Sequence, residues 1–218
     1  SQGRDENKRT CFYTLNLDPL YNHKGYRKLL YNKMLEESKK FNCTKILTGI
    51  YNHPNYKEHQ KLLIKEDFKL VQTNREYSCN ILKVDQKKYH PLIEKLELEG
   101  IKFYDSKKEL RDRLNHYKKL EELEWTYAQD FPIPKGIKHT RAPFAQFMKD
   151  CLYFYENSYG AEIVAVKNEV YIGSTNIYLY PKAEPHKAWT GGLGVLKKFR
   201  RKGIATALKI KAIEGLLK

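Results

Sequence analysis

The stretch Val195–Thr206, VLKKFRRKGIAT, decides how the second half of the chain is expected to fold. Its apolar beginning indicates the end of a strand, its centre a basic turn, and Gly203 the beginning of a helix over 203–218. The first N–H groups of a helix have no partners within the helix, and together with the helix dipole they attract anions. The stretch therefore predicts an anion site at the start of the last helix.

A phosphate at this site would be bound mainly by backbone groups. Gly203 lets the backbone approach a phosphate closely, and Ala205 is small enough to allow the same. Three basic side chains add attraction at longer range: Arg200, Arg201 and Lys202. The pattern is neither a GxxxxGK[ST] loop nor a dinucleotide fingerprint, because residues 191–194 (GGLG) lack the third glycine at the required place. A basic helix start that is merely solvated is the alternative.

The order of these residues resembles the coenzyme-A loop of the GNAT superfamily of acyl-CoA N-acyltransferases. Arg200-x-x-Gly203-x-Ala205 is similar to the family's Arg/Gln-x-x-Gly-x-Gly/Ala signature, and the run GVLKKFRRKGIATALKIKAIE resembles the motif through its helix. Arg201 departs from the pattern, because the family often has glycine there. The resemblance covers most of 101–218, where predicted strands follow in the family's order: 161–167, 170–179 and 187–195.

The resemblance implies acetyl-CoA as cofactor and direct transfer of its acetyl (acyl) group to an amine. It implies cofactor contacts at Leu193, Gly194, Val195, Arg200, Arg201, Lys202, Gly203, Ile204, Ala205 and Thr206. The thioester would lie where the sheet splays beside the bulged strand 187–195, and the Val195 N–H would hold the oxyanion. The amine must lose a proton to react, so a base is required. The sequence assigns no catalytic base or acid.

Several side chains are candidates for the acceptor side of the site, and each has a second interpretation. Glu162 and Glu169 could act as base, but each is near a turn and is expected to be solvated. Asp130 could bind an amine, although an Asp before Phe-Pro is more typical of a cap or turn. Three aromatic residues could line the acceptor cleft or simply pack: Tyr178, Tyr180 and Trp189.

An internal match at an offset of 178 residues predicts a duplication. Leu17–Gly25 (LDPLYNHKG) corresponds to Val195–Gly203 (VLKKFRRKG), and each segment follows a predicted strand and opens a predicted helix. In the first copy the signature reads Asn22-x-x-Gly25-x-Arg27, which puts bulky Arg27 where a small residue should approach phosphate. We therefore expect the first copy to be degenerate and structural.

The first copy also resembles the later half of the family's fold. Residues 45–83 indicate a strand, a helix and a pair of strands at 68–73 and 76–84. Many members place a tyrosine acid late in that helix, where this chain has Leu62-Leu63-Ile64. Tyr56 is interpreted as a surface or packing residue.

The expected fold class is α/β with a mixed sheet, arranged as tandem GNAT-like domains. We expect a degenerate half domain over 1–84, a partly helical linker over 85–100, and a GNAT-like domain with the coenzyme-A loop over 101–218. Within the last, Ser106 and Glu109 have capping-box spacing before a helix that reaches residue 129. The chain is interpreted as a tandem protein without its first and last segments, or as copies that complete each other within the chain or in a homodimer.

Charge and cysteine content bound the remaining classes. A net charge of +15 favours polyanions, which could be nucleic acid, an anionic membrane or the phosphates of coenzyme A, and the charge alone does not choose among them. No apolar run is long enough for a transmembrane helix, and the charged N-terminus does not resemble a signal peptide. Four cysteines without short spacing predict reduced, mostly buried thiols in a cytoplasmic protein with no metal site: Cys11, Cys43, Cys79 and Cys151.

These observations rank three functions. The leading prediction is an acyl-CoA-dependent N-acetyltransferase that acts on a small-molecule or peptide amine. The first alternative is a basic nucleic-acid-binding protein without catalysis, supported by the net charge and the many tyrosines. The second alternative is a GNAT-like scaffold that no longer reacts, because the first copy has lost its small residue and its tyrosine.

Overall fold

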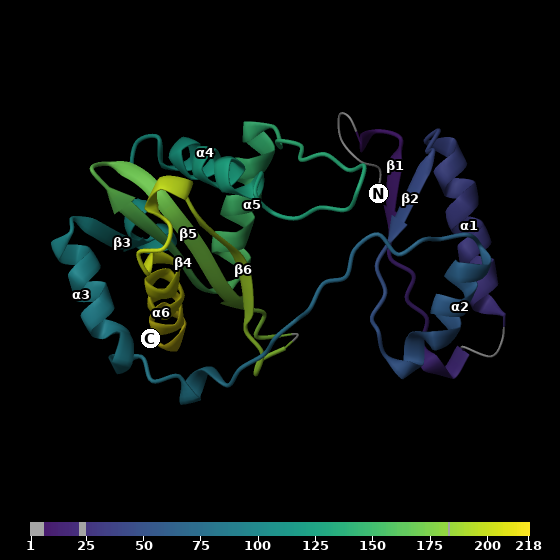
Figure 1. Ribbon diagram of the computed structural model, residues 1–218, viewed down its shortest axis with the longest axis horizontal. Helices are drawn as coiled ribbons and strands as arrows, with labels where there is room; N and C mark the ends of the chain where they lie inside the picture. The colour runs from purple at the N-terminus through teal and green to yellow at the C-terminus, as the bar shows by residue number, and fades with distance from the viewer. Residues whose placement is uncertain (1–6, 22–24, 183) are drawn as a thin grey trace. The chain divides into compact units, whose positions relative to one another are not determined.

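The computed structural model describes residues 7–21, 25–182 and 184–218. The chain divides into two compact units, drawn in Figure 1. Unit 1 comprises Ser1–Arg75 with Ile133–Thr140, and unit 2 comprises Glu76–Pro132 with Arg141–Lys218. In the part of the chain that the structure describes, no helix is both long and apolar enough to cross a bilayer.

Unit 2 contains a four-stranded antiparallel sheet in the order β3-β4-β5-β6. The strands are β3 Ile101–Asp105, β4 Tyr159–Lys167, β5 Val170–Leu179 and β6 Trp189–Val195. A two-residue turn joins β4 to β5, and both its residues have positive φ, 49° at Asn168 and 62° at Glu169. That geometry suits the twist of a hairpin. The strands predicted at 161–167, 170–179 and 187–195 are confirmed to within two residues.

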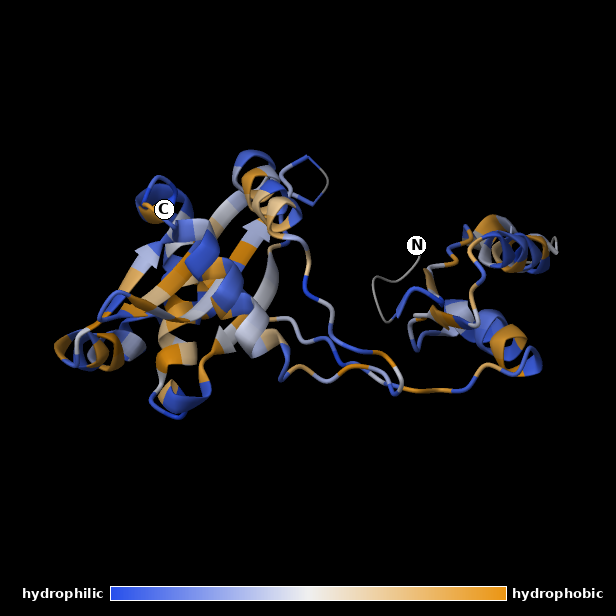
Figure 2. Cartoon of the chain, turned by 90° about the horizontal axis from the view of Figure 1, so that it is seen from above, coloured by the Kyte–Doolittle hydropathy of each residue, from blue (hydrophilic) through white to orange (hydrophobic). Residues whose placement is uncertain are grey.

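Helices cover both faces of this sheet. One face packs against α6 Ile204–Leu217, whose small and branched residues enter a core with Ile163, Ala165 and Ile172. The other face packs against α4 His116–Ala128, through Leu120, Leu123 and Tyr127. The helix α5 Phe144–Asn157 contacts α4 on that side. Figure 2 shows hydrophobic residues recurring along these strands and helices, as burial on two faces requires.

The interval 85–100, expected to be a linker, instead contributes to the core of unit 2. It forms α3 His90–Leu98, in which Ile93 and Leu96 are buried against α6 and β3. Its many charged residues face solvent, so its composition resembles a linker while its apolar spacing is that of a packed helix.

The single helix expected over 106–129 is two elements. A π-helical turn, Ser106–Leu110, precedes α4. Its cap is Asp105 and not Ser106: the Asp105 carboxylate accepts from the Lys108 N–H at 3.3 Å, and Glu109 accepts from the Asp105 N–H at 2.6 Å. These two bonds resemble a capping box, but the cap is one residue earlier than expected, and Glu109 is the fourth residue after it instead of the third. Ser106 is therefore available for a different, buried contact.

Unit 1 contains a two-stranded parallel sheet of β1 Thr10–Tyr13 and β2 Lys45–Thr48. Parallel strands need a crossover, and α1 Tyr26–Lys40 supplies it. A second helix, α2 Lys57–Lys65, follows β2, and the core is small: Leu15, Tyr31 and Met34. The strands expected at 68–73 and 76–84 do not form a ladder, and Leu70 and Tyr77 are each 86% exposed. Side chains left in solvent stabilise no pairing there.

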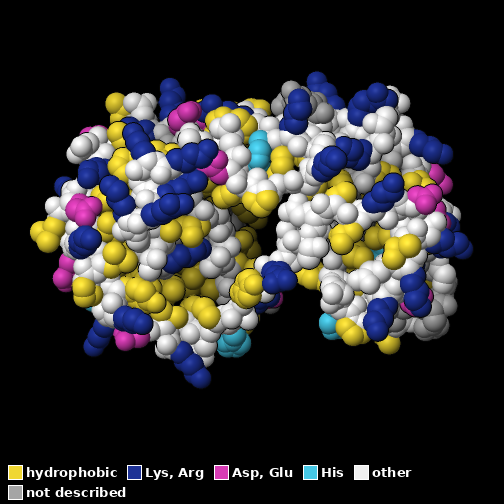
Figure 3. All heavy atoms as spheres, viewed as in Figure 1, with side chains coloured by type: hydrophobic (Ala, Val, Ile, Leu, Met, Phe, Trp, Pro, Cys, Tyr) yellow, Lys and Arg dark blue, Asp and Glu magenta, His cyan; other side chains and the backbone are white. Residues whose placement is uncertain are grey.

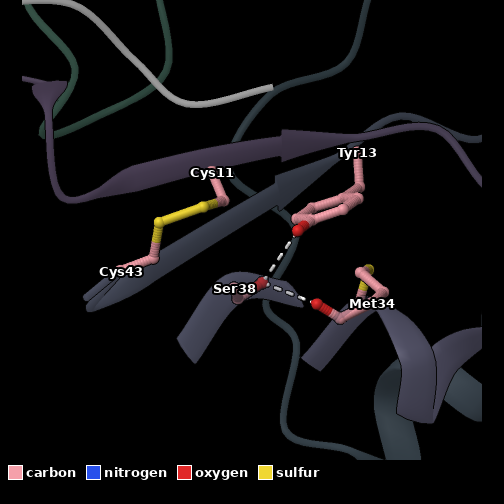
Figure 4. The surroundings of a disulfide bond; sticks show 5 residues. All are labelled: Cys11, Tyr13, Met34, Ser38 and Cys43. Carbon is pink, nitrogen blue, oxygen red and sulfur yellow. Dashed lines mark hydrogen bonds between the residues drawn. A yellow bond between two sulfur atoms is a disulfide. The ribbon is translucent and has the colours of Figure 1, made fainter. Parts of the chain in front are cut away.

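Two of the cysteines expected as thiols are joined. Cys11 on β1 and Cys43, just before β2, form a disulfide whose Cα atoms are 6.1 Å apart (Figure 4). The parallel register places Cys11 opposite Ile46, so residues at the beginning of β2 come near it. Cys79 is exposed and Cys151 is partly buried, and both are free thiols. Sequence spacing missed the pair because a β-α-β crossover brings together residues that are far apart in the chain.

Candidate active site

The strand β6 lies at an edge of the sheet in unit 2, and some of its backbone groups face away from the sheet. Among the described strands of unit 2, β6 is last in the order and pairs with β5 alone. The Leu196 N–H donates to the Ile172 carbonyl at 2.9 Å, while Val195 is opposite Gly173. Successive residues of an antiparallel strand direct their N–H and C=O groups to opposite sides. Val195 therefore directs its backbone groups to the open edge.

The strand β6 carries the bulge that the resemblance implies. Thr175 pairs with Leu193 and Ile177 pairs with Thr190, so two residues of β6, Gly191 and Gly192, oppose Asn176 alone. A bulge bends its strand and ends regular pairing. The side chain of Asn176 covers Gly191, where an added Cβ would be 1.9 Å from Asn176 Oδ1. Glycine is required there for this close approach.

The loop after β6 leads to the start of α6 through two left-handed residues. Arg201 has φ 63° and Gly203 has φ 86°, and Gly203 is the N-cap of α6 with no side-chain hydrogen bond to the cap. An added Cβ at Gly203 would be 2.7 Å from Leu92 Cδ1. Gly203 is thus required by backbone conformation and by contact with α3, in addition to the closeness to phosphate that the sequence suggested.

The first turn of α6 has the features of an anion site. The first backbone bond of the helix runs from the Ala207 N–H to the Gly203 carbonyl at 3.0 Å, so the N–H groups of Ile204, Ala205 and Thr206 precede it. Ile204 is buried, Ala205 is half-buried and Thr206 is exposed. These N–H groups and the helix dipole favour a negative ligand.

The Arg200 side chain is held within the protein. Its Nε donates to the Val195 carbonyl at 2.7 Å, and its Nη2 donates to Asp130 Oδ2 at 2.5 Å. Lys197 pairs with the other oxygen of the same carboxylate at 2.9 Å. Hydrogen bonds from Lys197 and Arg200 lower the pKa of Asp130. Asp130 therefore lies in the turn after α4, one of the two positions expected for it, and its carboxylate ties the basic loop to the end of α4 instead of being free to bind an amine.

A pocket of about 460 Å³ opens at this point of unit 2. Its lining comes from the end of α4 and from the loop after β6: Thr126, Tyr127, Gln129, Asp130, Leu196, Lys197, Lys198 and Arg200. Lysine and arginine on one wall make the pocket suitable for an anionic group. In Figure 3 such basic side chains are also spread over the visible surface of both units, so net charge alone does not mark the site.

Tyr127 lies across β6 at the bulge. Its ring occupies the space that a Cβ at Gly194 would need, within 2.0 Å of the ring atoms, and its hydroxyl is 3.1 Å from Ser174 Oγ. Burial and the nearby Glu124 raise the pKa of the Tyr127 phenol. Burial and the charge of Glu162 raise the pKa of Glu124 to about 8. The face of the sheet beside the bulge is therefore lined by a phenol and carboxyl groups.

Glu162 is not solvated, contrary to the sequence expectation. It is 6% exposed, and Tyr155 donates to its Oε2 at 2.7 Å. Burial raises its pKa, although the hydrogen bond from Tyr155 opposes that shift. Glu169 is exposed in the β4–β5 turn, as expected. The two glutamates that looked alike in sequence thus have different roles.

The aromatic candidates gather at the other end of β5 and β6. Tyr178 is opposite Trp189, and its ring centroid is 5.6 Å from that of Tyr180. The Trp189 N–H donates to Glu184 at 2.7 Å, and Lys187 Nζ lies 3.6 Å from the Trp189 ring centroid. They contact one another beside the bulge, which fits either packing or a cleft wall. Their role in acceptor binding stays a prediction.

Residues 119–217 match the model of the family described as acetyltransferase (GNAT). The match contains nearly all of α4, the strands β4 to β6, the basic loop and α6, which are the elements just described. This region therefore belongs to the GNAT family, and unit 2 has a GNAT fold. No curated protein sequence matches the chain.

Three solved structures with similar folds are named for acetyl transfer. One is a GCN5-related glucosamine N-acetyltransferase region of a fungal multi-domain beta-N-acetylglucosaminidase, with 15% identity, a TM-score of 0.60, and coverage of 94% of this chain and 25% of that chain. At this identity the likeness shows a shared fold and no more. The aligned share spans both units of the present chain.

Two further structures are less similar. A proposed acetyltransferase from Pyrococcus horikoshii has 20% identity and a TM-score of 0.39, with 55% of this chain and 36% of that chain covered. An aminoglycoside acetyltransferase from an uncultured soil metagenomic sample has 23% identity and a TM-score of 0.36, with 52% and 68% covered. The chain thus spans well under two thirds of the archaeal and fungal structures.

Proposed function

We propose that the protein transfers an acetyl (acyl) group from acetyl-CoA directly to an amine. Acyl transfer is the reaction of the family to which 119–217 belongs. The observation that carries the finer proposal is the continuity of two features: the open edge of β6 at Val195, and the uncapped start of α6 at Gly203. A thioester arm along the strand and a pyrophosphate at the helix would occupy them together.

The residues at this place fit such a ligand. Backbone N–H groups of Ile204 to Thr206 would hold the pyrophosphate, with Arg201 and Lys202 on its flanks. The edge of β6 from Leu193 to Val195 would accompany the pantetheine, and the Val195 N–H would hold the oxyanion. Arg200 acts differently from the sequence expectation in this proposal, because its bonds to Asp130 and Val195 fix the loop rather than reach outward.

The acceptor in this proposal is a small-molecule or peptide amine. The compartment of the protein is a separate question, because the expected cytoplasmic location conflicts with the Cys11–Cys43 disulfide. Disulfides persist in oxidising compartments and are rare in the cytosol. Alkylation of thiols in intact cells, followed by mass spectrometry of the Cys11 and Cys43 peptides, decides between the cytosol and an oxidising compartment.

Acetyl-CoA binding measured by calorimetry tests the proposal. Reversal of two loop charges, Arg201→Glu with Lys202→Glu, should weaken binding by about tenfold or more, or ~1.4 kcal/mol, and binding should weaken with added salt. Lys149→Glu on α5 is the matched control, because it changes the charge of an exposed residue of the same unit outside the loop. Wild-type protein that does not bind acetyl-CoA contradicts the proposal.

Release of free thiol from acetyl-CoA tests the reaction itself. Glucosamine, named for the fungal neighbour, spermidine and a lysine-containing peptide represent small and peptide amines. We expect thiol release with at least one class and none without an amine. Binding without amine-dependent release would favour the non-reacting scaffold.

A further inference from the structure

A chain of hydrogen bonds runs through the interior of unit 2 to Glu162. Tyr155 donates to Glu162 at 2.7 Å, Ser106 lies 2.7 Å from the Tyr155 hydroxyl, and His116 Nε2 lies 3.0 Å from Ser106 Oγ. The chain ends at Tyr171, whose hydroxyl is 3.0 Å from His116 Nδ1. Its members come from five separate segments and are all buried: Ser106 (0% exposed), His116 (1%), Tyr155 (2%), Glu162 (6%) and Tyr171 (8%).

Counting protons fixes the direction of this chain. Burial lowers the pKa of His116 to about 4, so the imidazole is neutral near pH 7 and carries one N–H. A hydroxyl has one proton to donate. If Tyr155 gives its proton to the Glu162 carboxylate, Ser106 must donate to Tyr155, and His116 Nε2 must donate to Ser106. His116 Nδ1 is then an acceptor for the Tyr171 hydroxyl. Every donor therefore points toward Glu162.

The sheet connects Glu162 with the bulge of β6. Glu162 on β4 is directly opposite Asn176 on β5, and the Asn176 side chain covers Gly191. Residues opposite each other in an antiparallel pair share one face of the sheet. A row thus runs across three strands from Glu162 to the bulge, on the face where Tyr127 also lies. Gly192, at the end of this row, is exposed.

We propose that Glu162 accepts the proton of the attacking amine, and that Tyr155, Ser106, His116 and Tyr171 are positioning residues that hold its carboxylate. This inference rests on the proposed function. The amine nitrogen forms a bond to the thioester carbon, the C–S bond breaks, and its electron pair leaves with sulfur. The N–H proton goes to the Glu162 carboxylate and from there to the sulfur, so amine and thioester become amide and thiol.

The surroundings of Glu162 suit a base of more than ordinary strength. Burial and the nearby Asp105 raise its pKa, and the hydrogen bond donated by Tyr155 opposes the rise. The other ionisable groups that face it are Tyr117, Glu124 and Tyr127 from α4 and Cys151 from α5, and the charge of Glu162 contributes to raising the pKa of each. No positive side chain contributes to the shift at Glu162 among the described residues. A carboxylate whose pKa is raised by burial accepts an amine proton more readily than a solvated one.

The first test replaces Glu162 by glutamine, which keeps its size. Glu162→Gln should lower kcat with acetyl-CoA and the best amine of the panel by about 100-fold or more, as expected for loss of a general base. Acetyl-CoA affinity should stay within about twofold, because the loop at 195–206 is intact. Glu169→Gln is the matched control: the same substitution at the exposed end of the same hairpin. Equal kcat in both variants overturns the proposal.

The second test separates positioning from mere packing. Tyr155→Phe removes a donor to the charged carboxylate, which raises the pKa of Glu162, so the rising limb of the kcat/KM pH profile should move to higher pH. Tyr117→Phe is the control, because its ring contacts His116 but its hydroxyl is outside the chain. A Tyr155→Phe profile that coincides with that of Tyr117→Phe overturns the positioning role.

A third measurement needs no acceptor. Side-chain ¹⁵N spectra of His116 should show the neutral Nε2–H tautomer at pH 7 in the wild type. The Nδ1–H tautomer or a charged ring contradicts the direction of the chain. Absence of turnover in the wild type, with this spectrum present, contradicts the proposed function and the catalytic role of Glu162, while the ordered chain itself stands.

Discussion

The helix starts at Gly25 and Gly203 have nearly the same backbone and very different neighbours. Both glycines are left-handed N-caps without a side-chain cap, with φ 70° and φ 86°. Among the described residues, apart from its chain neighbours, nothing lies within 4 Å of a Cβ added at Gly25, whereas a Cβ added at Gly203 would meet Leu92. Two residues further on, Arg27 is buried in unit 1 and Ala205 is half-buried in unit 2. The two helix starts therefore share their backbone geometry, but the space available for an anion depends on the residues around each of them.

This comparison bears on the expected duplication, which stays a prediction. Both segments join a strand to a helix through a left-handed glycine, as the offset of 178 residues suggests. Asn22, the first residue of the earlier signature, lies outside the described residues, with His23 and Lys24. Variants that treat the two segments alike or differently can sharpen the comparison.

The largest difference expected between the units is their dependence on a covalent bond. Cys11→Ala with Cys43→Ala opens a loop with a sequence separation of 32 residues, which should cost unit 1 about 3–4 kcal/mol in the chain-entropy model. Unit 2 has a core on both faces of its sheet and should keep its protection in hydrogen exchange. Cys79→Ser, at an exposed free thiol, is the control. Equal loss of protection in both units contradicts this expectation.

Alanine at the two glycines should give unequal losses. Gly25→Ala meets the cost of a left-handed alanine, about 1–2 kcal/mol. Gly203→Ala adds the contact with Leu92, and overpacking of this kind costs about 1–3 kcal/mol more. Urea denaturation monitored by exchange within α1 and α6 measures both. Loss of stability at Gly25 equal to that at Gly203 would mean that Leu92 moves aside freely.

Exchange of the residues two positions later tests which copy can hold phosphate. Ala205→Arg places the unit 1 residue at the start of α6 and should weaken acetyl-CoA binding by about tenfold, or ~1.4 kcal/mol, because bulk displaces the phosphate. Ala205→Ser, a small substitution, should bind nearly as the wild type does. If Ala205→Arg binds more tightly, charge outweighs bulk, and Arg27 no longer explains why the first copy is degenerate.

The smallest effect expected is a pH dependence of the stability of unit 2 that comes from His116. Burial lowers the pKa of His116 from its usual 6.5 to about 4, so the folded state binds fewer protons than the unfolded state between these values. The free energy of unfolding should therefore fall as pH decreases from about 6.5 to 4. His116→Gln should reduce this fall, as followed by the urea midpoint of unit 2. His139→Gln, in the segment Ile133–Thr140 of unit 1, should leave the fall unchanged.

Much of unit 2 was predictable from sequence because its signals are local. The order of strands, the bulge, the turn at Asn168 and Glu169, and the loop with Gly203 all depend on residues near one another in the chain. The burial of Glu162 could also be predicted from the sequence. Glu162, Val164 and Val166 are two residues apart and therefore lie on the same face of β4. Proximity to a turn outweighed that alternation in the sequence interpretation, and solvation was inferred wrongly.

The remainder depended on contacts between distant residues. His116 begins a stripe with Leu120, Leu123 and Tyr127 at helical spacing, which indicates burial but not its partners. Ser106 and Tyr155 are separated by 49 residues, and Arg200 and Asp130 by 70. Spacing within the sequence carries no information about such pairs. The disulfide likewise joins residues that are far apart in the chain. The composition of residues 68–84 favours strands, but no described strand pairs with them.

The Cys11–Cys43 disulfide has a mechanical consequence. It closes a ring of chain that contains the whole of α1, with its ends at neighbouring strands. A force applied to the two ends of the protein would be carried by the disulfide and not by the chain inside the ring. α1 could then unfold only within the closed ring, without lengthening the chain between the two cysteines. Reduction would release the sequence separation of 32 residues, or about 110 Å of extended chain at ~3.4 Å per residue. Under tension, unit 1 therefore gains this length only after a reductant breaks the disulfide.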